Sequence, residues 1–371
     1  MTSQPFSRTL HALRGIAACA VLLFHWYQFF PSAGATIRPD LLAFTLLDPT
    51  TYLGFGWMGV PLFFVLSGYL LGGQVIDTEF SSAFLRRFWL RRVLRIYPAV
   101  WAELVVLLLL STVIAGLISQ QGMATLPLQF LLWLNLPPFM AQPINGVWWT
   151  LPVELGFYLL LPLLGVLARY TRWWIILFGC ALVTLGWRSV WFVATDTQNY
   201  LGILPVLDSL PGVLLTFILG FSLNYLPTDL SVRRRRWGAL ACLITLLSLM
   251  QWQLRLDDVY WTGHWILVVW PPLTAIPIAG LVYFLRDADP PREWRWLNSS
   301  GLVWLGHVSF GIYLWHFQVM RVLVLLYPEA WATPLNSLLA LAISLPVTLL
   351  LAALSFYLIE QPLMGWGKKH A

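Results

Sequence analysis

Four stretches of the chain contain no charged side chain over lengths that can cross a lipid bilayer. Asp, Glu, Lys and Arg are all absent from residues 15–37, 49–76, 259–285 and 330–359. A helix needs about 20 residues to span the hydrocarbon core, whereas membrane β-strands are shorter and alternate in polarity. These runs predict an all-α polytopic membrane protein that is embedded in the bilayer.

The composition excludes other classes of protein. Only 10% of the residues are charged, 59% are hydrophobic, and the mean hydropathy is +0.75. Soluble domains are about a quarter charged, so a soluble enzyme and a disordered chain are both excluded. The net charge of +6 comes from basic residues in the connections between apolar runs. They form no basic face interleaved with aromatic residues, so no nucleic-acid partner is expected.

The apolar pattern predicts ten membrane spans. Segment 119–147 is not counted, because its apolar part is short and is surrounded by prolines; we expect a re-entrant or interfacial loop. Residues 1–371 are expected to form a single integral-membrane domain, with an uncleaved first span and no soluble appendage. The predicted spans are 10–30, 52–74, 96–118, 148–168, 173–191, 202–225, 237–255, 263–285, 301–326 and 335–359.

The distribution of basic residues predicts the orientation. With both termini in the cytoplasm, all but four of the 22 Lys and Arg residues lie on the cytoplasmic side. A crossing at 119–147 would move most of the later basic residues outside, against the positive-inside rule. The four exceptions in the ten-span arrangement are Arg38, Arg188, Arg255 and Arg321.

Two ionisable residues of the first span are candidates for function, because charges inside a bilayer are costly. Arg14 and His25 are eleven residues apart, which on a helix is about three turns and about 16 Å on one stripe. Separately, Arg14 could be an interfacial arginine and His25 a structural core histidine. Their common stripe favours a functional pair.

Counting residues from the expected helix ends places three ionisable side chains in one layer. His25, Glu154 and His316 are predicted about 7–15 Å below the outer surface. A carboxylate beside an imidazole can orient a general base, and a structural His–Glu pair between helices is the alternative. Glu103, in the third span, is expected to pair with an arginine, and Glu360 to be exposed at a cytoplasmic helix end.

A dense group of arginines precedes the third span. Its members exceed what topology requires, and Arg92 and Arg95 share one helix face at i, i+3 spacing. Arginine binds phosphate in a bidentate manner, so phosphate binding and a purely topological role remain alternatives. Between this group and His25, Ser67 and Gly68 would permit close helix contact or line a passage. The group consists of Arg86, Arg87, Arg91, Arg92 and Arg95.

Six motifs, in order along nearly the whole chain, resemble the integral-membrane acyltransferase-3 family. The first is the spacing of Arg14 and His25, which is similar to the family's Arg-x10-His signature. The other segments that carry the resemblance are 59–68, with Phe-Phe-Val-Leu-Ser-Gly, 92–98, with Arg-x-x-Arg, 149–154, with Trp-Thr-Leu-Pro-Val-Glu, 309–316, which ends in His316, and Glu360-Gln-Pro362.

The resemblance implies acyl-CoA as the donor substrate, with acetyl as the default acyl group, and no bound cofactor. It also implies a carbohydrate or lipid-linked glycan as acceptor, in a bacterial cytoplasmic membrane. Arg14, Arg92 and Arg95 would bind the phosphates of CoA. His25 would act as a general base or as a transient acyl carrier, and Glu154 would orient His25 or the acceptor. Ser67, Tyr313 and His316 are expected to line the passage or to support the site.

Two other classes remain. A ten-span protein with buried charges could be a transporter of a lipid-linked sugar or a metabolite, although no paired halves with matching broken helices are evident. A purely structural membrane partner would leave the ionisable groups at matched depths unexplained. The histidines lack neighbours at metal-ligand spacing, so no metal site is expected.

Overall fold

The computed structural model describes residues 7–37, 43, 45–76, 78–195, 200–256, 264–287 and 290–370. Within these ranges the chain is helical and has no strand. Nine of the described helices are long and apolar enough to cross a membrane, and Leu210–Tyr225 is a shorter apolar helix. The all-α polytopic prediction is confirmed. Counting the shorter helix, the helices follow the ten predicted spans.

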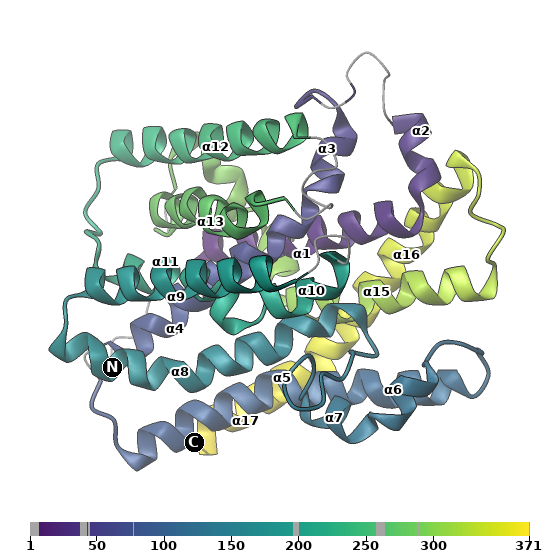
Figure 1. Cartoon of the computed structure of the whole chain (residues 1–371), viewed down its shortest axis with the longest axis horizontal. Helices are drawn as coiled ribbons and strands as arrows, with labels where there is room; N and C mark the ends of the chain where they lie inside the picture. The colour runs from purple at the N-terminus through teal and green to yellow at the C-terminus, as the bar shows by residue number, and fades with distance from the viewer. Residues whose placement is uncertain are drawn as a thin grey trace.

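Helices α8, α11 and α12 run roughly parallel across the view in Figure 1. The main helices are α1 (Arg8–Phe29), α4 (Gly59–Val75), α5 (Ser82–Ser111), α8 (Thr150–Tyr170), α9 (Trp173–Ala194), α10 (Tyr200–Leu207), α11 (Leu210–Ser222), α12 (Val232–Arg255), α13 (Ile266–Leu285), α14 (Ser300–His307), α15 (Ser309–Leu326), α16 (Pro334–Ser355) and α17 (Gln361–His370). Short elements are η1 (Pro31–Ala33), α2 (Gly34–Ile37), α3 (Pro49–Gly54), η3 (Gly56–Met58), α6 (Gln120–Ala124), α7 (Leu126–Leu131), η4 (Gly146–Trp149), η6 (Leu223–Tyr225), η8 (Arg292–Asn298) and the π-helical turn η9 (Phe356–Glu360).

Helices α1 and α4 lie at the centre of the bundle. Helix α1 packs against α4, α14 and α15, and α4 packs against α11. A Cβ atom at Gly68 would lie 1.9 Å from the Phe217 carbonyl oxygen, and one at Gly220 would lie 2.0 Å from that of Val65. Only glycine allows the backbones of α4 and α11 to approach this closely. Close helix contact at Gly68 is therefore confirmed.

Two predicted spans are interrupted rather than continuous. Span 202–225 consists of α10 and α11, which are separated at Asp208 and Ser209, and Pro211 lies in the first turn of α11. Pro211 has no N–H donor, so it cannot continue the hydrogen bonds of α10, whereas the first turn of a new helix tolerates it. Span 301–326 breaks at Val308 between α14 and α15. The hydropathy pattern continues through both breaks and does not reveal them.

The third span begins earlier than predicted. Helix α5 starts at Ser82, fourteen residues before the predicted boundary, so the arginine group lies on the helix itself. The Ser81 hydroxyl accepts a hydrogen bond from the Phe84 backbone N–H and caps the first turn. Apolarity indicates where the lipid begins, and here the helix extends beyond that point.

Segment 119–147 contains the short helices α6 and α7 and the start of the short turn η4, so the prediction that it does not span is confirmed. It turns back along α5: the Tyr97 hydroxyl donates to the Leu131 carbonyl oxygen at 3.1 Å, and the Trp101 indole donates to that of Phe130 at 3.0 Å. Tyr97 is fourteen residues from the end of α5, or about 21 Å. Figure 1 shows α7 beside α5. The contacts match a re-entrant segment.

Candidate active site

His25 on α1 and His316 on α15 form a hydrogen-bonded pair. The His316 Nε2 and His25 Nδ1 atoms are 3.0 Å apart. His316 is fully buried, whereas His25 is half-buried and lines a cavity. The structure therefore brings together two of the three side chains that the sequence predicts at one depth.

Backbone carbonyls around the pair determine where the imidazole protons lie. His316 Nδ1 is 2.9 Å from the Ile312 carbonyl oxygen, and His25 Nδ1 is 3.0 Å from that of Val21. A carbonyl oxygen only accepts, so in the neutral rings each Nδ1 carries the hydrogen. His316 Nε2 then accepts from His25 Nδ1. The His25 Nε2 atom keeps its lone pair and has no hydrogen-bond partner among the described residues.

The cavity beside His25, here called the histidine cavity, has a volume of about 170 Å³. Aliphatic and aromatic side chains form most of its wall, among them Trp57 and Trp149, which lie on the short turns before α4 and α8. Asp208, at the break between α10 and α11, is its only carboxylate among the described residues. Sequence reasoning did not select Asp208; its position in the apolar stretch 202–225 was the available signal.

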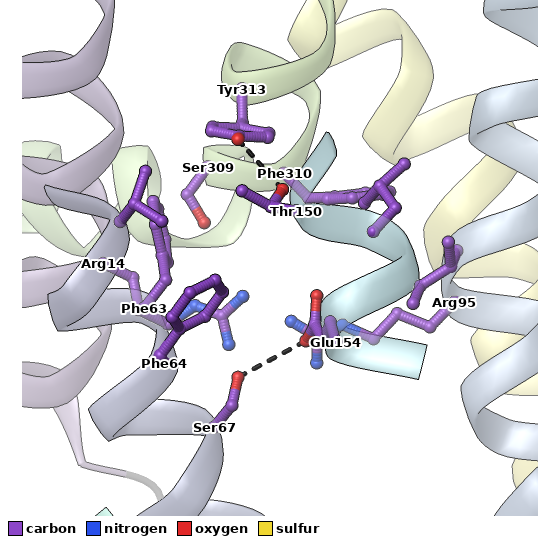
Figure 2. Close-up of a pocket in the computed structure, with 13 residues that line it drawn as sticks. Arg14, Phe63, Phe64, Ser67, Arg95, Thr150, Glu154, Ser309, Phe310 and Tyr313 are labelled. Carbon is purple, nitrogen blue, oxygen red and sulfur yellow. Dashed lines mark hydrogen bonds between the residues drawn. The ribbon is translucent and has the colours of Figure 1, made fainter. Parts of the chain in front are cut away.

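A second cavity, here called the arginine cavity, lies among α1, α4, α5, α8 and α15 and has a volume of about 50 Å³. In Figure 2, Arg14 and Arg95 extend from opposite sides toward the Glu154 carboxylate, with Ser67 below it. The Ser67 hydroxyl donates to Glu154 Oε1 at 3.3 Å. Two cations and one carboxylate give this cavity a net positive charge suited to an anionic ligand.

Arg14 and Arg95 have no hydrogen-bond or ion-pair partner among the described residues, and the Nε of Arg14 is a buried donor. A buried donor without a partner is costly, and bound anionic oxygens would satisfy both guanidinium groups. Arg92 lies elsewhere: its guanidinium stacks over the rings of Phe88 and Tyr158, at 5.7 and 5.8 Å from their centres. It is not among the residues that line either cavity.

Glu154 does not hydrogen-bond to His25. Its bonds among the described residues are with Ser67 and with the Tyr158 hydroxyl, which donates to Oε1. The expectation that Glu154 orients His25 is therefore not met, since His316 is the hydrogen-bonded neighbour. A role for Glu154 toward the acceptor stays a prediction.

The depth of Glu154 explains the difference. Tyr313 shares a 2.9 Å hydrogen bond with Thr150 on α8, so these two residues lie at one level (Figure 2). Glu154 is four residues along α8 from that level, and His316 is three residues along α15 in the opposite direction. The separation along the membrane normal is about 10 Å. The prediction assumed that the outer helix ends are level, which α8 does not satisfy.

The two cavities adjoin. Val60, Phe64 and Tyr313 line both of them. Tyr313 is fixed by its hydroxyl, which donates to the Val147 carbonyl oxygen at 2.9 Å. A molecule that enters the arginine cavity therefore meets, beyond this common wall, the cavity that contains His25. Ser67 and Tyr313 line the arginine cavity, and their role in a passage stays a prediction.

Two further carboxylates differ from their sequence predictions. Glu103 is fully buried and pairs with no arginine in the part of the chain that the structure describes; it accepts hydrogen bonds from the Asn145 amide at 2.6 Å and the Trp148 indole at 2.9 Å. Glu360 is buried rather than exposed, and it accepts from the Ser355 hydroxyl at 2.9 Å. Both errors have one cause: neutral donors distant in sequence, or on the same helix turn, satisfy a carboxylate as well as a cation does.

Comparison with known proteins identifies the family. Residues 8–356 match the family model described as "Acyltransferase domain". The chain belongs to the acyltransferase-3 family. Because the match includes α1 to α16, the histidine pair and both cavities lie inside the acyltransferase-3 domain.

Several curated proteins are similar to this acyltransferase-3 chain. Peptidoglycan O-acetyltransferase OatA of Listeria monocytogenes is 27% identical, over 98% of this chain and 57% of its own length. Acyltransferase MdmB of Streptomyces mycarofaciens is 29% identical, over 96% of this chain and 91% of its own length. Nodulation protein 10 of Rhizobium leguminosarum bv. viciae is 29% identical, over 95% and 92%.

The chain spans little more than half the length of the first of these relatives, the curated peptidoglycan O-acetyltransferase. It spans nearly all of MdmB and of nodulation protein 10. No solved structure is a significant match for the chain.

Proposed function

We propose that this protein transfers an acyl group, acetyl by default, from acyl-CoA to a hydroxyl of a carbohydrate in the bacterial cytoplasmic membrane. The donor would enter from the cytosol, and the acceptor would be a cell-surface or lipid-linked glycan. The main support is one observation: the arginine cavity and the histidine cavity share a wall. A cavity lined by two arginines and an imidazole with a free lone pair therefore lie next to each other within an acyltransferase domain.

The arginine cavity supports the donor half of the proposal. Arg14 and Arg95 would bind phosphate oxygens of CoA, because their guanidinium donors have no partner among the described residues. Along α1 the distance from Arg14 to His25 is about 16 Å, which is comparable to the length of a pantetheine arm. Arg92 would act indirectly: it lies over the ring of Tyr158 and would hold the Tyr158 hydroxyl in its hydrogen bond to Glu154.

The histidine pair supports the chemical half. His25 Nε2 would take the proton of the acceptor hydroxyl while the hydroxyl oxygen attacks the thioester carbonyl carbon. The carbon–sulfur bond then breaks, and the CoA thiolate receives the proton from His25. Alternatively, Nε2 itself attacks the carbonyl carbon and expels the CoA thiolate; the acceptor hydroxyl then attacks the acyl-imidazolium, which frees His25, and the hydroxyl proton passes to the thiolate. In both routes His316 orients His25 and favours the reactive tautomer.

The test is acyl transfer by the purified full-length protein in detergent. We would supply acetyl-CoA labelled in the acetyl group, together with membranes from a strain in which the gene for this chain is deleted. We expect label in the glycan fraction of those membranes, in proportion to enzyme. A transporter without acyl-transfer chemistry would leave the glycans unlabelled, and that result would overturn the proposal.

Replacing Arg95 with Ala is expected to weaken acetyl-CoA binding by about 1.5–3 kcal/mol, the scale of a hydrogen bond to a charged group. Arg95→Lys should restore only part of the affinity, because lysine cannot form the bidentate fork. Isothermal titration or tryptophan quenching would measure the dissociation constant. Arg87→Ala is the matched control, since Arg87 is exposed and outside the cavity. Equal affinities for Arg95→Ala and Arg87→Ala would remove Arg95 from the donor site.

A further inference from the structure

Asp208 lines the histidine cavity and also pairs with a buried arginine. It follows α10 at the point where the predicted span is interrupted, and its side chain is 27% exposed. The rest of the cavity wall is largely apolar and aromatic, and among the described residues His25 and the Tyr313 hydroxyl are its other ionisable groups. Ligand sites typically combine an apolar wall with a few fixed polar groups that determine orientation.

Arg188 on α9 holds Asp208 in place. Its side chain is fully buried, and its Nη1 lies 2.9 Å from Asp208 Oδ1. The same guanidinium donates to the carbonyl oxygens of Leu207, Gly212 and Leu267, at 2.9, 3.3 and 2.7 Å. Leu207 and Gly212 flank the break between α10 and α11, so Arg188 satisfies carbonyls near the interruption. Geometry of this kind fixes the carboxylate rather than letting it rotate freely.

The ion pair uses only one oxygen of the carboxylate. Among the described residues Asp208 Oδ2 has no hydrogen-bond partner. A structural ion pair alone requires neither a cavity nor an accessible second oxygen. An oxygen that keeps its lone pairs, on a carboxylate whose charge is already balanced, is a hydrogen-bond acceptor for a neutral donor such as a hydroxyl.

The aromatic wall agrees with a ring-shaped, polyhydroxylated ligand. Trp57 and Trp149, on two separate short turns, present large apolar surfaces to the cavity, and Trp149 Nε1 has no hydrogen-bond partner among the described residues. Tryptophan combines an apolar face with one polar donor, a combination that suits the apolar face and hydroxyl edge of a sugar ring. A simple alcohol would use the His25 side of the cavity and leave Asp208 without a role.

We propose that Asp208 binds a second hydroxyl of the acceptor, next to the one that is acylated, and that the histidine cavity therefore selects polyhydroxylated rings over simple alcohols. The inference rests on the proposed function and adds a specificity-determining residue to it. Asp208 takes no part in bond making. It positions the acceptor so that the reacting hydroxyl meets His25 Nε2.

The test measures transfer of labelled acetyl from acetyl-CoA to membranes of the deletion strain, with both substrates varied. We expect Asp208→Asn to raise the apparent KM for the acceptor membranes at least 10-fold and to leave the KM for acetyl-CoA within 2-fold of wild type. Sites built to hydrogen-bond a hydroxyl discriminate strongly when that bond is lost. Asp287→Asn is the matched control, because Asp287 pairs with Arg235 at 3.2 Å away from both cavities.

Asp208→Glu distinguishes a loss of acceptor binding from a loss of folding. It keeps the charge beside Arg188 but moves the carboxylate by one methylene, so it should also raise the acceptor KM while the melting temperature stays near wild type. An unchanged acceptor KM in Asp208→Asn would overturn the inference alone. A parallel loss of acetyl-CoA affinity and thermal stability in both variants would also overturn it, since Asp208 would then be structural. No transfer by the wild-type protein would instead reject the proposed function.

Discussion

His25→Gln is expected to reduce acyl transfer by about 10²–10⁴-fold, the usual contribution of general acid–base catalysis. The glutamine amide can still donate to the Val21 carbonyl oxygen, as His25 Nδ1 does at 3.0 Å. Glutamine cannot accept a proton at neutral pH and cannot form an acyl-imidazole. Loss of activity would therefore report the chemistry of the Nε2 lone pair and not the loss of a helix contact. Initial rates with labelled acetyl-CoA measure the effect.

His307→Gln provides the control for this substitution. His307 Nδ1 lies 2.8 Å from the Val303 carbonyl oxygen, which repeats the local bonding of His25, but the side chain lines neither cavity. We expect His307→Gln to keep most of the activity. If His25→Gln expressed normally and transferred acetyl at a rate near wild type, both roles proposed for His25 would be wrong. The chemistry would then have to be sought at His316 and Glu154.

Arg188→Met is expected to cost about 3–5 kcal/mol of unfolding free energy, the range observed when one partner of a buried ion pair is removed. The substitution leaves the carbonyl oxygens of Leu207 and Leu267 without their donor and Asp208 without its counter-charge. Methionine fills much of the same volume, so the effect reports lost polar contacts rather than a cavity. Reversible unfolding in mixed micelles measures the free energy.

Arg255→Met is the comparison for Arg188→Met. Both arginines were predicted on the outer side, but Arg255 is exposed at the end of α12 and should change the free energy of unfolding by less than about 0.5 kcal/mol. Similar values for the two variants would contradict the role assigned to Arg188. The break between α10 and α11 would then be maintained by Pro211 and packing alone.

The sequence predicted the helical architecture well, because apolar length and basic loops are set by the bilayer itself. Ten apolar segments follow directly from that constraint. The breaks at Ser209 and Val308 could not be predicted in the same way, since hydropathy carries no information about backbone geometry. The early start of α5 had a local signal, the Ser81 cap, that a search for apolar runs passes over.

The site was predicted in part. The stripe of Arg14 and His25 depends on one helix, so periodicity was enough to find it. The contact between His25 and His316 requires the packing of α1 against α15, and sequence could only place them at similar depths. The depth of Glu154 was predicted wrongly, because the prediction placed all outer helix ends at one depth and α8 begins deeper in the membrane. Asp208 and Arg188 were not selected, because they pair across two separate helices and the sequence does not show which helices pack together.

The most direct test of transfer through the His25 site uses sealed membrane vesicles of both orientations that contain the full-length protein. Labelled acetyl-CoA, which does not cross the bilayer, is added outside inside-out vesicles or right-side-out vesicles, and acetylated glycan is measured. A donor site at Arg14 and Arg95 facing the cytosol predicts labelling in the inside-out vesicles only, and its loss in His25→Gln. Equal labelling in both orientations, or labelling that survives His25→Gln, would contradict the proposed route from the arginine cavity to His25.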